Sequence, residues 1–181
     1  MAKLRKFVSY RNIKRPYTRK SKFTKKNFVR VAPTLRIQRF EAGNPNKKFD
    51  YIVLIRPDKR LQIRDNAIEA ARQASNRLLS KHMTKDDFYF KTRVYPHHIL
   101  RENPLASGAG ADRMSTGMAR SFGKNIGIAA QVNEKKPIFQ ISINKQNLKH
   151  AKQAMKLAAT KMPCRCYIDI FDSVTKKKVY V

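Results

Sequence analysis

Acidic residues, cysteine and long apolar runs are all scarce in this chain of 181 residues. Two cysteines cannot build a disulfide framework, so a small secreted disulfide scaffold is excluded and a reducing compartment is indicated. No stretch reaches the roughly 18 apolar residues that a membrane span needs, and the first residues lack the apolar core of a secretory signal. We therefore expect a cytoplasmic protein with no membrane partner.

The shortage of acid leaves a formal net charge of +29, from 41 Lys and Arg against 12 Asp and Glu. Residues 1–40 hold 14 of these cations and no carboxylate, because the first acid is Glu41. Charge at this density repels itself in a compact chain unless a polyanion neutralises it, so a nucleic acid is the expected partner. Hydrophobic residues still make up 41% of the chain, which is enough for one modest core.

Residues 1–34 show no sustained helix or strand period, and Pro16 and Pro33 interrupt them. We expect an extended basic arm that orders on its partner. Rings stand between its cations, which suits stacking on bases, and Tyr10 and Tyr17 are the best candidates. The alternative is that these rings pack on the protein's own surface. The RNA-binding candidates of the arm are Arg11, Lys14, Arg15, Tyr17, Arg19, Lys20, Lys22, Lys25 and Lys26.

Residues 35–181 are expected to form a single α+β domain, with two helices packed on a mostly antiparallel sheet. Alternation or apolar runs predict strands over residues 35–40, 51–55, 61–63, 88–94, 127–132, 137–143 and 164–171, with an edge at 178–181 and a turn at 41–48. The strand 51–55 should be buried on both faces. Three-and-four spacing predicts helices over residues 64–81 and 145–161, the second capped by Asn144. Arg64 and Arg72 of the first helix are candidates for RNA contact, with a solvated face as the alternative.

Five of the six glycines lie between residues 108 and 127, in a Gly-rich loop expected at about residues 101–126. Glycine lets the backbone approach a ligand closely and exposes N–H groups to phosphate. A loop of this length is usually functional, so we expect it to enter RNA, with a surface loop that has no partner as the alternative. Its candidate residues are Arg101, Gly108, Gly110, Asp112, Arg113, Met114, Thr116, Gly117, Arg120 and Lys124.

Motifs for catalysis or metal binding are incomplete. The stretch from Gly117 to Lys124 resembles a phosphate-binding loop, but five residues separate its glycines and Asn125 replaces the required Ser or Thr. Cys164 and Cys166 share an apolar strand face without a second ligand pair, so core packing is favoured over zinc. We therefore predict no enzyme activity, no cofactor and no metal. A nucleotide hydrolase and a DNA-compacting protein are the rival interpretations.

Several segments, in this order, are together similar to one known family. They are KRPYTRK at 14–20, IRDNAIEAAR at 63–72, YPHH at 95–98, GADRMSTGM at 110–118 and FGK at 122–124. The set resembles the large-subunit ribosomal protein L-ten-e family, the archaeal and eukaryotic counterpart of bacterial ribosomal protein L-sixteen. The resemblance implies a compact α/β sandwich of the hammerhead type with a basic N-terminal extension. The end of the chain at Val181, without the longer C-terminus of eukaryotic members, favours an archaeal member.

The resemblance also implies a role in translation. A structural constituent of the large ribosomal subunit would bind its rRNA, help shape the aminoacyl-tRNA site and place the Gly-rich loop near the peptidyl-transferase centre. The implied partners are large-subunit rRNA, the tRNA acceptor region at the aminoacyl and peptidyl sites, and neighbouring ribosomal proteins. We expect no homo-oligomer.

Overall fold

The computed structural model describes residues 6–29, 31–103 and 123–179. Its strands are β1 (Glu41–Gly43), β2 (Tyr51–Pro57), β3 (Leu61–Arg64), β4 (Phe88–Thr92), β5 (His98–Glu102), β6 (Lys124–Val132), β7 (Phe139–Ile143) and β8 (Cys166–Asp172). Its helices are α1 (Asp65–His82) and α3 (Leu148–Thr160), with short 3-10 turns η1 (Phe7–Tyr10), η2 (Thr24–Lys26) and η3 (Lys145–Asn147). The predicted α+β class is confirmed.

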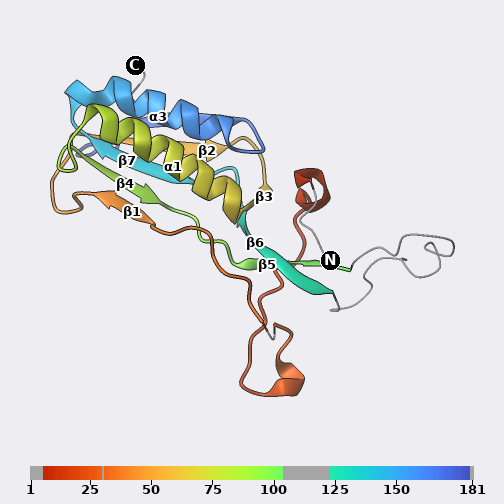
Figure 1. Ribbon diagram of the computed structural model, residues 1–181. Helices are drawn as coiled ribbons and strands as arrows, with labels where there is room; N and C mark the ends of the chain where they lie inside the picture. The colour runs from red at the N-terminus through yellow and green to blue at the C-terminus, as the bar shows by residue number, and fades with distance from the viewer. Residues whose placement is uncertain (1–5, 30, 104–122, 180–181) are drawn as a thin grey trace.

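Two antiparallel sheets organise these strands. The larger sheet has the order β1-β4-β7-β2-β8, and the smaller has the order β3-β6-β5. Both helices lie on one side of the larger sheet, while the smaller sheet extends beyond its end toward the N-terminal segment (Figure 1). The expected single sheet is therefore two, and α1 packs against β3 and β6 of the smaller sheet as well as against β4 of the larger one.

Helices and larger sheet share one core. Phe90, Phe139 and Ile141 from the sheet and Ala71 and Met155 from the helices are all at most 1% exposed and belong to one cluster. The apolar side of each helix therefore faces the core, as the spacing of its apolar residues predicted. Burial of this apolar surface is the main stabilising contribution to the body of the protein.

The pattern of β2 corrects one prediction. Val53 and Ile55 are fully buried, whereas Ile52 and Leu54 between them are only partly buried. The apolar run thus does not lie between two covered layers, because the helices cover a single face of the sheet. The alternation in β4 and β7 is confirmed, with Phe90 and Ile141 facing the core.

The predicted strand at residues 35–40 is absent. Ile37 is buried and Leu35 is partly buried against the core, so the alternation reflects packing of an extended segment. The segment lacks a ladder, although the carbonyl of Phe40 accepts a hydrogen bond from the N–H of Thr92 at 2.7 Å. Pairing begins only at Glu41, where β1 occupies the first residues of the predicted turn.

Two further boundaries differ from expectation. Asn144 makes no side-chain capping bond, and the chain forms the 3-10 turn η3 before α3 begins at Leu148. The predicted edge at 178–181 is a single bridge between Phe171 and Lys178 in the described part of the chain. Strand β5 was not predicted. The packing of the N-terminal segment on it, described next, explains why its sequence shows no strand pattern.

Candidate nucleic-acid interface

The N-terminal segment packs on both faces of the smaller sheet. Tyr10 contacts Leu100 and Ala129 and is 9% exposed. Val29 contacts Ile99 and Ile128 on the opposite face, since neighbouring residues of a strand point to opposite sides. Strand β5 is therefore covered on both faces, which removes the alternation that would have revealed it in the sequence.

Three amide side chains of the smaller sheet hold the backbone of this segment. Gln62 of β3 donates to the carbonyl of Tyr10, Gln131 of β6 donates to the carbonyl of Lys14 at 2.7 Å, and Asn125 of β6 donates to the carbonyl of Val31. Sequence analysis missed all three: Gln62 and Gln131 lie in predicted strands, and Asn125 lies in the predicted Gly-rich loop. These bonds bring backbone polar groups of the basic segment into a defined path.

Tyr17 connects the segment to β5. Its N–H donates to Nδ1 of His98 at 2.8 Å, and its carbonyl accepts from the N–H of Ile99 at 3.2 Å. The guanidinium of Arg101 lies 3.9 Å from the centre of the Tyr17 ring, which is a close cation–π contact. Tyr17 and Arg101, predicted as parts of an arm and a loop, thus meet in one place.

The electrostatics of His98 follow from this position. Burial is the main reason that the pKa of His98 falls from 6.5 to about 4, and nearby His97 and Arg101 lower it further. A neutral ring leaves Nδ1 free to accept the hydrogen bond from Tyr17, which an imidazolium cannot do. The docked position of Tyr17 therefore requires an uncharged His98.

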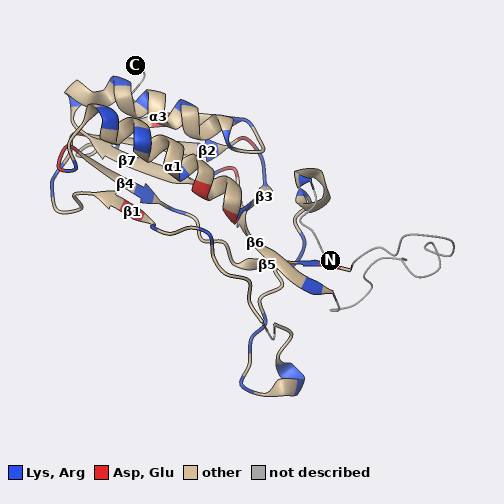
Figure 2. Ribbon diagram, in the orientation of Figure 1, with Lys and Arg blue, Asp and Glu red and all other residues tan. Residues whose placement is uncertain are grey.

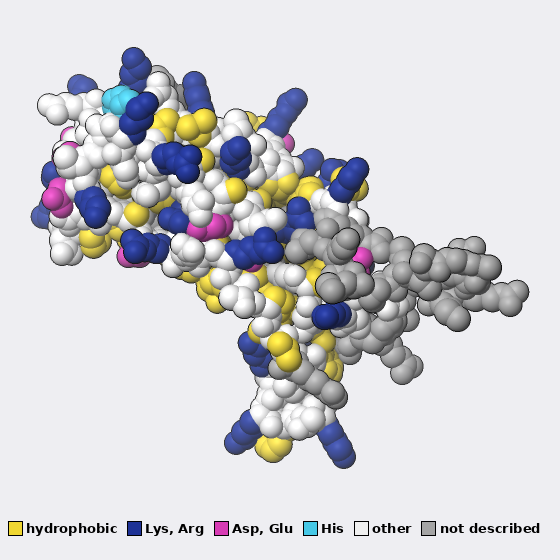
Figure 3. Space-filling view, in the orientation of Figure 1, with side chains coloured by type: hydrophobic (Ala, Val, Ile, Leu, Met, Phe, Trp, Pro, Cys, Tyr) yellow, Lys and Arg dark blue, Asp and Glu magenta, His cyan; other side chains and the backbone are white. Residues whose placement is uncertain are grey.

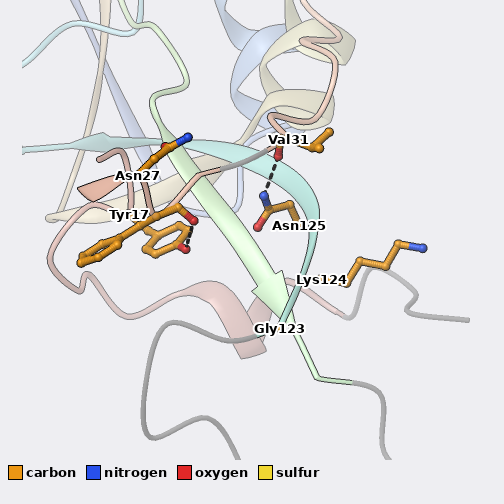
Figure 4. Close-up of a pocket in the computed structure, with 7 residues that line it drawn as sticks. Tyr17, Asn27, Val31, Gly123, Lys124 and Asn125 are labelled. Carbon is orange, nitrogen blue, oxygen red and sulfur yellow. Dashed lines mark hydrogen bonds between the residues drawn. The ribbon is translucent and has the colours of Figure 1, made fainter. Parts of the chain in front are cut away.

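Residues 19–29 form a closed loop rather than an extended arm. The N–H groups of Phe28 and Val29 both donate to the carbonyl of Arg19 at 3.2 Å, and η2 lies at the tip of this loop. The Tyr17 hydroxyl donates to the Phe28 carbonyl, and the two rings are stacked with centroids 6.4 Å apart. Figure 4 shows this contact together with the bond from Asn125 to Val31.

The cations of the segment lie over rings rather than beside carboxylates. The pairs are Arg11 over Phe7 at 5.8 Å, Arg19 over Phe28 at 4.9 Å, and Lys22 and Lys26 each 5.5 Å from Phe23. Among the described residues, no ion pair joins a cation of residues 6–29 to an acid. Lys and Arg mark this segment in Figure 2, and cationic side chains project from its far end in Figure 3.

The rings of the segment divide between two roles. Tyr10 is buried, which corrects its choice as a stacking residue and bears out the alternative that it packs on the protein. Phe23 and Phe28 are 58% and 44% exposed and are the rings that a ligand can reach. The choice of Tyr10 failed because ring identity in a sequence does not reveal which rings the smaller sheet covers.

Two hollows border the Tyr17–Phe28 pair. The first, of about 510 Å³, extends to Lys124 and Asn125, and the second, of about 520 Å³, extends to Arg101. The lining cations beside exposed rings can hold phosphates while the rings contact bases or sugars. Lys124 is exposed, and its side chain points away from the ring pair (Figure 4).

The two arginines expected on the first helix have different surroundings, since Arg64 ends β3 and only Arg72 lies in α1. Arg64 lies 5.9 Å from the centre of the Tyr10 ring, which places it beside the docked segment. Arg72 is buried and binds Glu69 through two hydrogen bonds of 2.8 and 2.7 Å. Burial alone would raise the pKa of Glu69, but the bonds from Arg72 and Gln73 outweigh it and lower that pKa. The expectation that Arg72 faces RNA or solvent is therefore wrong.

The Gly-rich segment begins and ends on paired strands. Glu102 of β5 lies opposite Lys124 of β6, so the two ends of the segment are neighbours. Arg101 and Lys124 thus belong to strands rather than to the loop in which they were predicted. The remaining predicted loop residues lie outside the described ones: Gly108, Gly110, Asp112, Arg113, Met114, Thr116, Gly117 and Arg120.

Other chemistry finds little support in the described residues. Lys124 and Asn125 start a strand, whereas the Lys of a phosphate-binding loop opens a helix. Cys164 and Cys166 are half-buried with their Sγ atoms 4.0 Å apart, and no group of three or more metal-ligating side chains occurs there. No helix in this part of the chain is long and apolar enough to cross a membrane.

Comparison with known proteins agrees with this geometry. The family model described as ribosomal protein L16p/L10e matches residues 14–169. The chain is 43% identical over 141 residues to the large ribosomal subunit protein uL16 of Hyperthermus butylicus, covering 78% of each chain. It is 42% identical over 141 residues to the large ribosomal subunit protein uL16 of Methanocella arvoryzae, covering 78% of this chain and 82% of that protein. Because the match includes both sheets, both helices and the docked segment from Lys14 onward, the chain belongs to the ribosomal protein L16p/L10e family.

Proposed function

We propose that this protein is a structural component of the large ribosomal subunit that binds rRNA in the cytoplasm. Residues 1–34 act as the basic rRNA-binding arm, and residues 35–181 form the single domain that carries it. The observation that carries this proposal is the docked arm, whose cations lie over rings and form no ion pair with an acid in the described part of the chain. Cations that lack internal carboxylate partners are suited to external phosphates.

The arm in this role supplies both phosphate and base contacts. At the far end of the arm, Lys22 and Lys26 each lie 5.5 Å from the exposed ring of Phe23, and Lys25 lines the same hollow. Docking on the smaller sheet fixes their direction before RNA arrives, so binding costs less conformational entropy. Relatives named large ribosomal subunit protein uL16 support the large subunit as the site of assembly.

We further propose that the segment at about 101–126 contacts the acceptor ends of tRNA near the peptidyl-transferase centre and helps shape the aminoacyl-tRNA site. Its two ends are held together by the pairing of β5 with β6, which gives the segment a fixed base. That base lies directly beside the arm, since Arg101 contacts Tyr17. Deleting residues 107–115 should leave fold and assembly mostly intact but impair translation, and loss of folding would instead make the segment structural.

Sedimentation of a native lysate on a sucrose gradient tests the assembly. Co-migration with large subunits through a moderate salt wash is expected, and a position at the top of the gradient would refute the proposal. Binding of the purified protein to duplex DNA and to rRNA at one salt concentration separates it from a DNA-compacting protein, which would bind both equally.

A variant that lacks three positive charges tests the arm itself. Replacing Lys22, Lys25 and Lys26 by Ser should weaken rRNA binding. The slope of log K against log salt should become shallower by roughly 0.7–0.9 for each phosphate that the variant no longer neutralises. The matched control replaces three exposed lysines around α3, namely Lys149, Lys156 and Lys161. An equal decrease in affinity in both variants would show that net charge, and not the arm, determines binding.

A further inference from the structure

The larger sheet has a second face on which no described helix lies (Figure 1). On β2, Val53 and Ile55 point to the helices, so Ile52, Leu54 and Arg56 point to the opposite side. None of these three side chains belongs to the core cluster. We call this side of the sheet the open face.

Three aromatic rings share the open face with the β2 side chains. In the register of the sheet, Arg56 lies opposite Tyr167 and Ile52 lies opposite Phe171, both on β8. Tyr89 joins them from β4, because it pairs with Ser142, which in turn pairs with Ile52. Tyr167 is 60% exposed. Tyr89 and Phe171 are partly buried, so the face exposes one ring largely and two rings in part.

The charges of the open face leave it net positive. Asp169 binds both Arg56 and Lys178, the latter at 2.7 Å, and Glu41 binds Lys91 at 2.7 Å. Burial would raise the pKa of Asp169, but its hydrogen bonds with Arg56 and Lys178 outweigh that effect and lower the pKa. Asp169 is therefore ionised at neutral pH and pairs with both cations.

Arg165 adds a further cation beside the exposed ring. It is exposed and lies two residues before Tyr167, and the described residues provide it with no acidic partner. A purely apolar protein partner would have to desolvate these cations without giving them a partner, which is costly. A polyanion that also carries planar apolar groups meets both features of the face.

The spacing of the rings restricts which kind of nucleic-acid segment can bind. Tyr167 and Phe171 are four residues apart on one strand, which corresponds to about 13 Å. Bases stacked on each other are separated by roughly 3.4 Å, so the two rings cannot contact adjacent stacked bases. Each ring can instead receive one base of a segment whose bases are splayed apart, as in RNA loops and bulges.

We propose that the open face binds an unpaired segment of rRNA, with one base stacked on Tyr167, another on Phe171, and phosphates held by Arg56, Arg165 and Lys178. This inference rests on the proposed assembly into the large subunit but uses a surface other than the smaller sheet on which the described part of the arm docks. The protein would then contact rRNA on two separate sides.

Photo-crosslinking in assembled subunits tests this placement. The full chain carries p-benzoylphenylalanine at position 167, and a second protein carries it at Val174, which is 87% exposed and follows the end of β8. A crosslink to rRNA from position 167 that exceeds the one from position 174 is expected. A crosslink from position 167 to another protein, or none above the control, would overturn the proposal. Failure of both proteins to enter the subunit would instead contradict the proposed function.

Binding of the full chain to rRNA fragments provides the second test. Tyr167→Ala should weaken binding about 5- to 150-fold, the range for removal of one stacked base, without changing the salt dependence. Tyr167→Phe keeps the ring and should keep the affinity, and Val174→Ala serves as the exposed control. Equal affinity of Tyr167→Ala and the unaltered protein, with circular dichroism showing both folded, would overturn the stacking role.

Discussion

Acidification should loosen the arm from the smaller sheet, because the bond that holds Tyr17 needs a neutral His98. The pKa of His98 is about 4 when Tyr17 is docked and 6.5 in its ordinary state. Between these values the released state binds more protons than the docked one, so docking weakens as the pH falls. Docking is strongest above pH 6.5 and loses stability progressively toward pH 4.

The magnitude follows from the same two values. At about 1.4 kcal/mol for each pKa unit, the interval from 6.5 to about 4 sets an upper bound of roughly 3 kcal/mol. The ring of His98 is partly exposed, so water screens part of this difference, and we expect about 1–2 kcal/mol. That corresponds to a decrease of roughly 5- to 30-fold in the docking equilibrium.

Nuclear magnetic resonance of the full chain measures both sides of this linkage. The imidazole of His98 should titrate near pH 4, and the amide of Tyr17 should shift along the same curve. His98→Asn is the matched control, since the Asn side chain keeps an acceptor oxygen but does not titrate. Titration of His98 near 6.5 with an unmoved Tyr17 amide, or an unchanged curve in His98→Asn, would refute the reasoning.

Three substitutions test the body of the protein, each by urea unfolding. Gly43→Ala should lower the free energy of unfolding by about 2–3 kcal/mol, since Gly43 has a φ of 88° and an added Cβ would lie 2.0 Å from the Phe88 carbonyl oxygen. Wild-type stability of this variant would show that β1 is dispensable. Glu69→Gln should lower the free energy of unfolding by about 3 kcal/mol, because it leaves the buried Arg72 without its ion-pair partner. The affinity for rRNA should not change, and a reduced affinity would show that Arg72 takes part in RNA binding. Phe90→Ala should cost about 3–5 kcal/mol, and a smaller effect would mean that the core refills the cavity.

Periodicity revealed the elements that one covered face defines. The helix at 64–81 corresponds to α1, and the strands at 88–94 and 137–143 correspond to β4 and β7, because each presents an apolar side to one core. The prediction failed where both sides are covered or where no ladder forms. Strand β5 lies between two parts of the arm, and residues 35–40 pack without pairing.

The interface could be predicted only in outline. Charge and rings indicated an RNA-binding arm, yet the sequence did not distinguish the buried Tyr10 from the exposed Phe23. Gln62 and Gln131 hold the arm through its carbonyls over separations of 52 and 117 residues. No local pattern reports a contact between residues so far apart, which is why these residues were missed.

The sequence by itself determined the chemical character of this protein. The charge of +29, the acid-free first 40 residues and the ordered family motifs follow from residue identities alone. Only the tertiary structure decided the surroundings of each cation, because Arg72 is buried against Glu69 whereas Arg101 lies over the ring of Tyr17. It also decided that the larger sheet keeps an open face, since helix placement depends on how distant segments pack. Net charge is a sum over residue types, whereas the exposure of a side chain and its contacts depend on which distant residues the fold brings together.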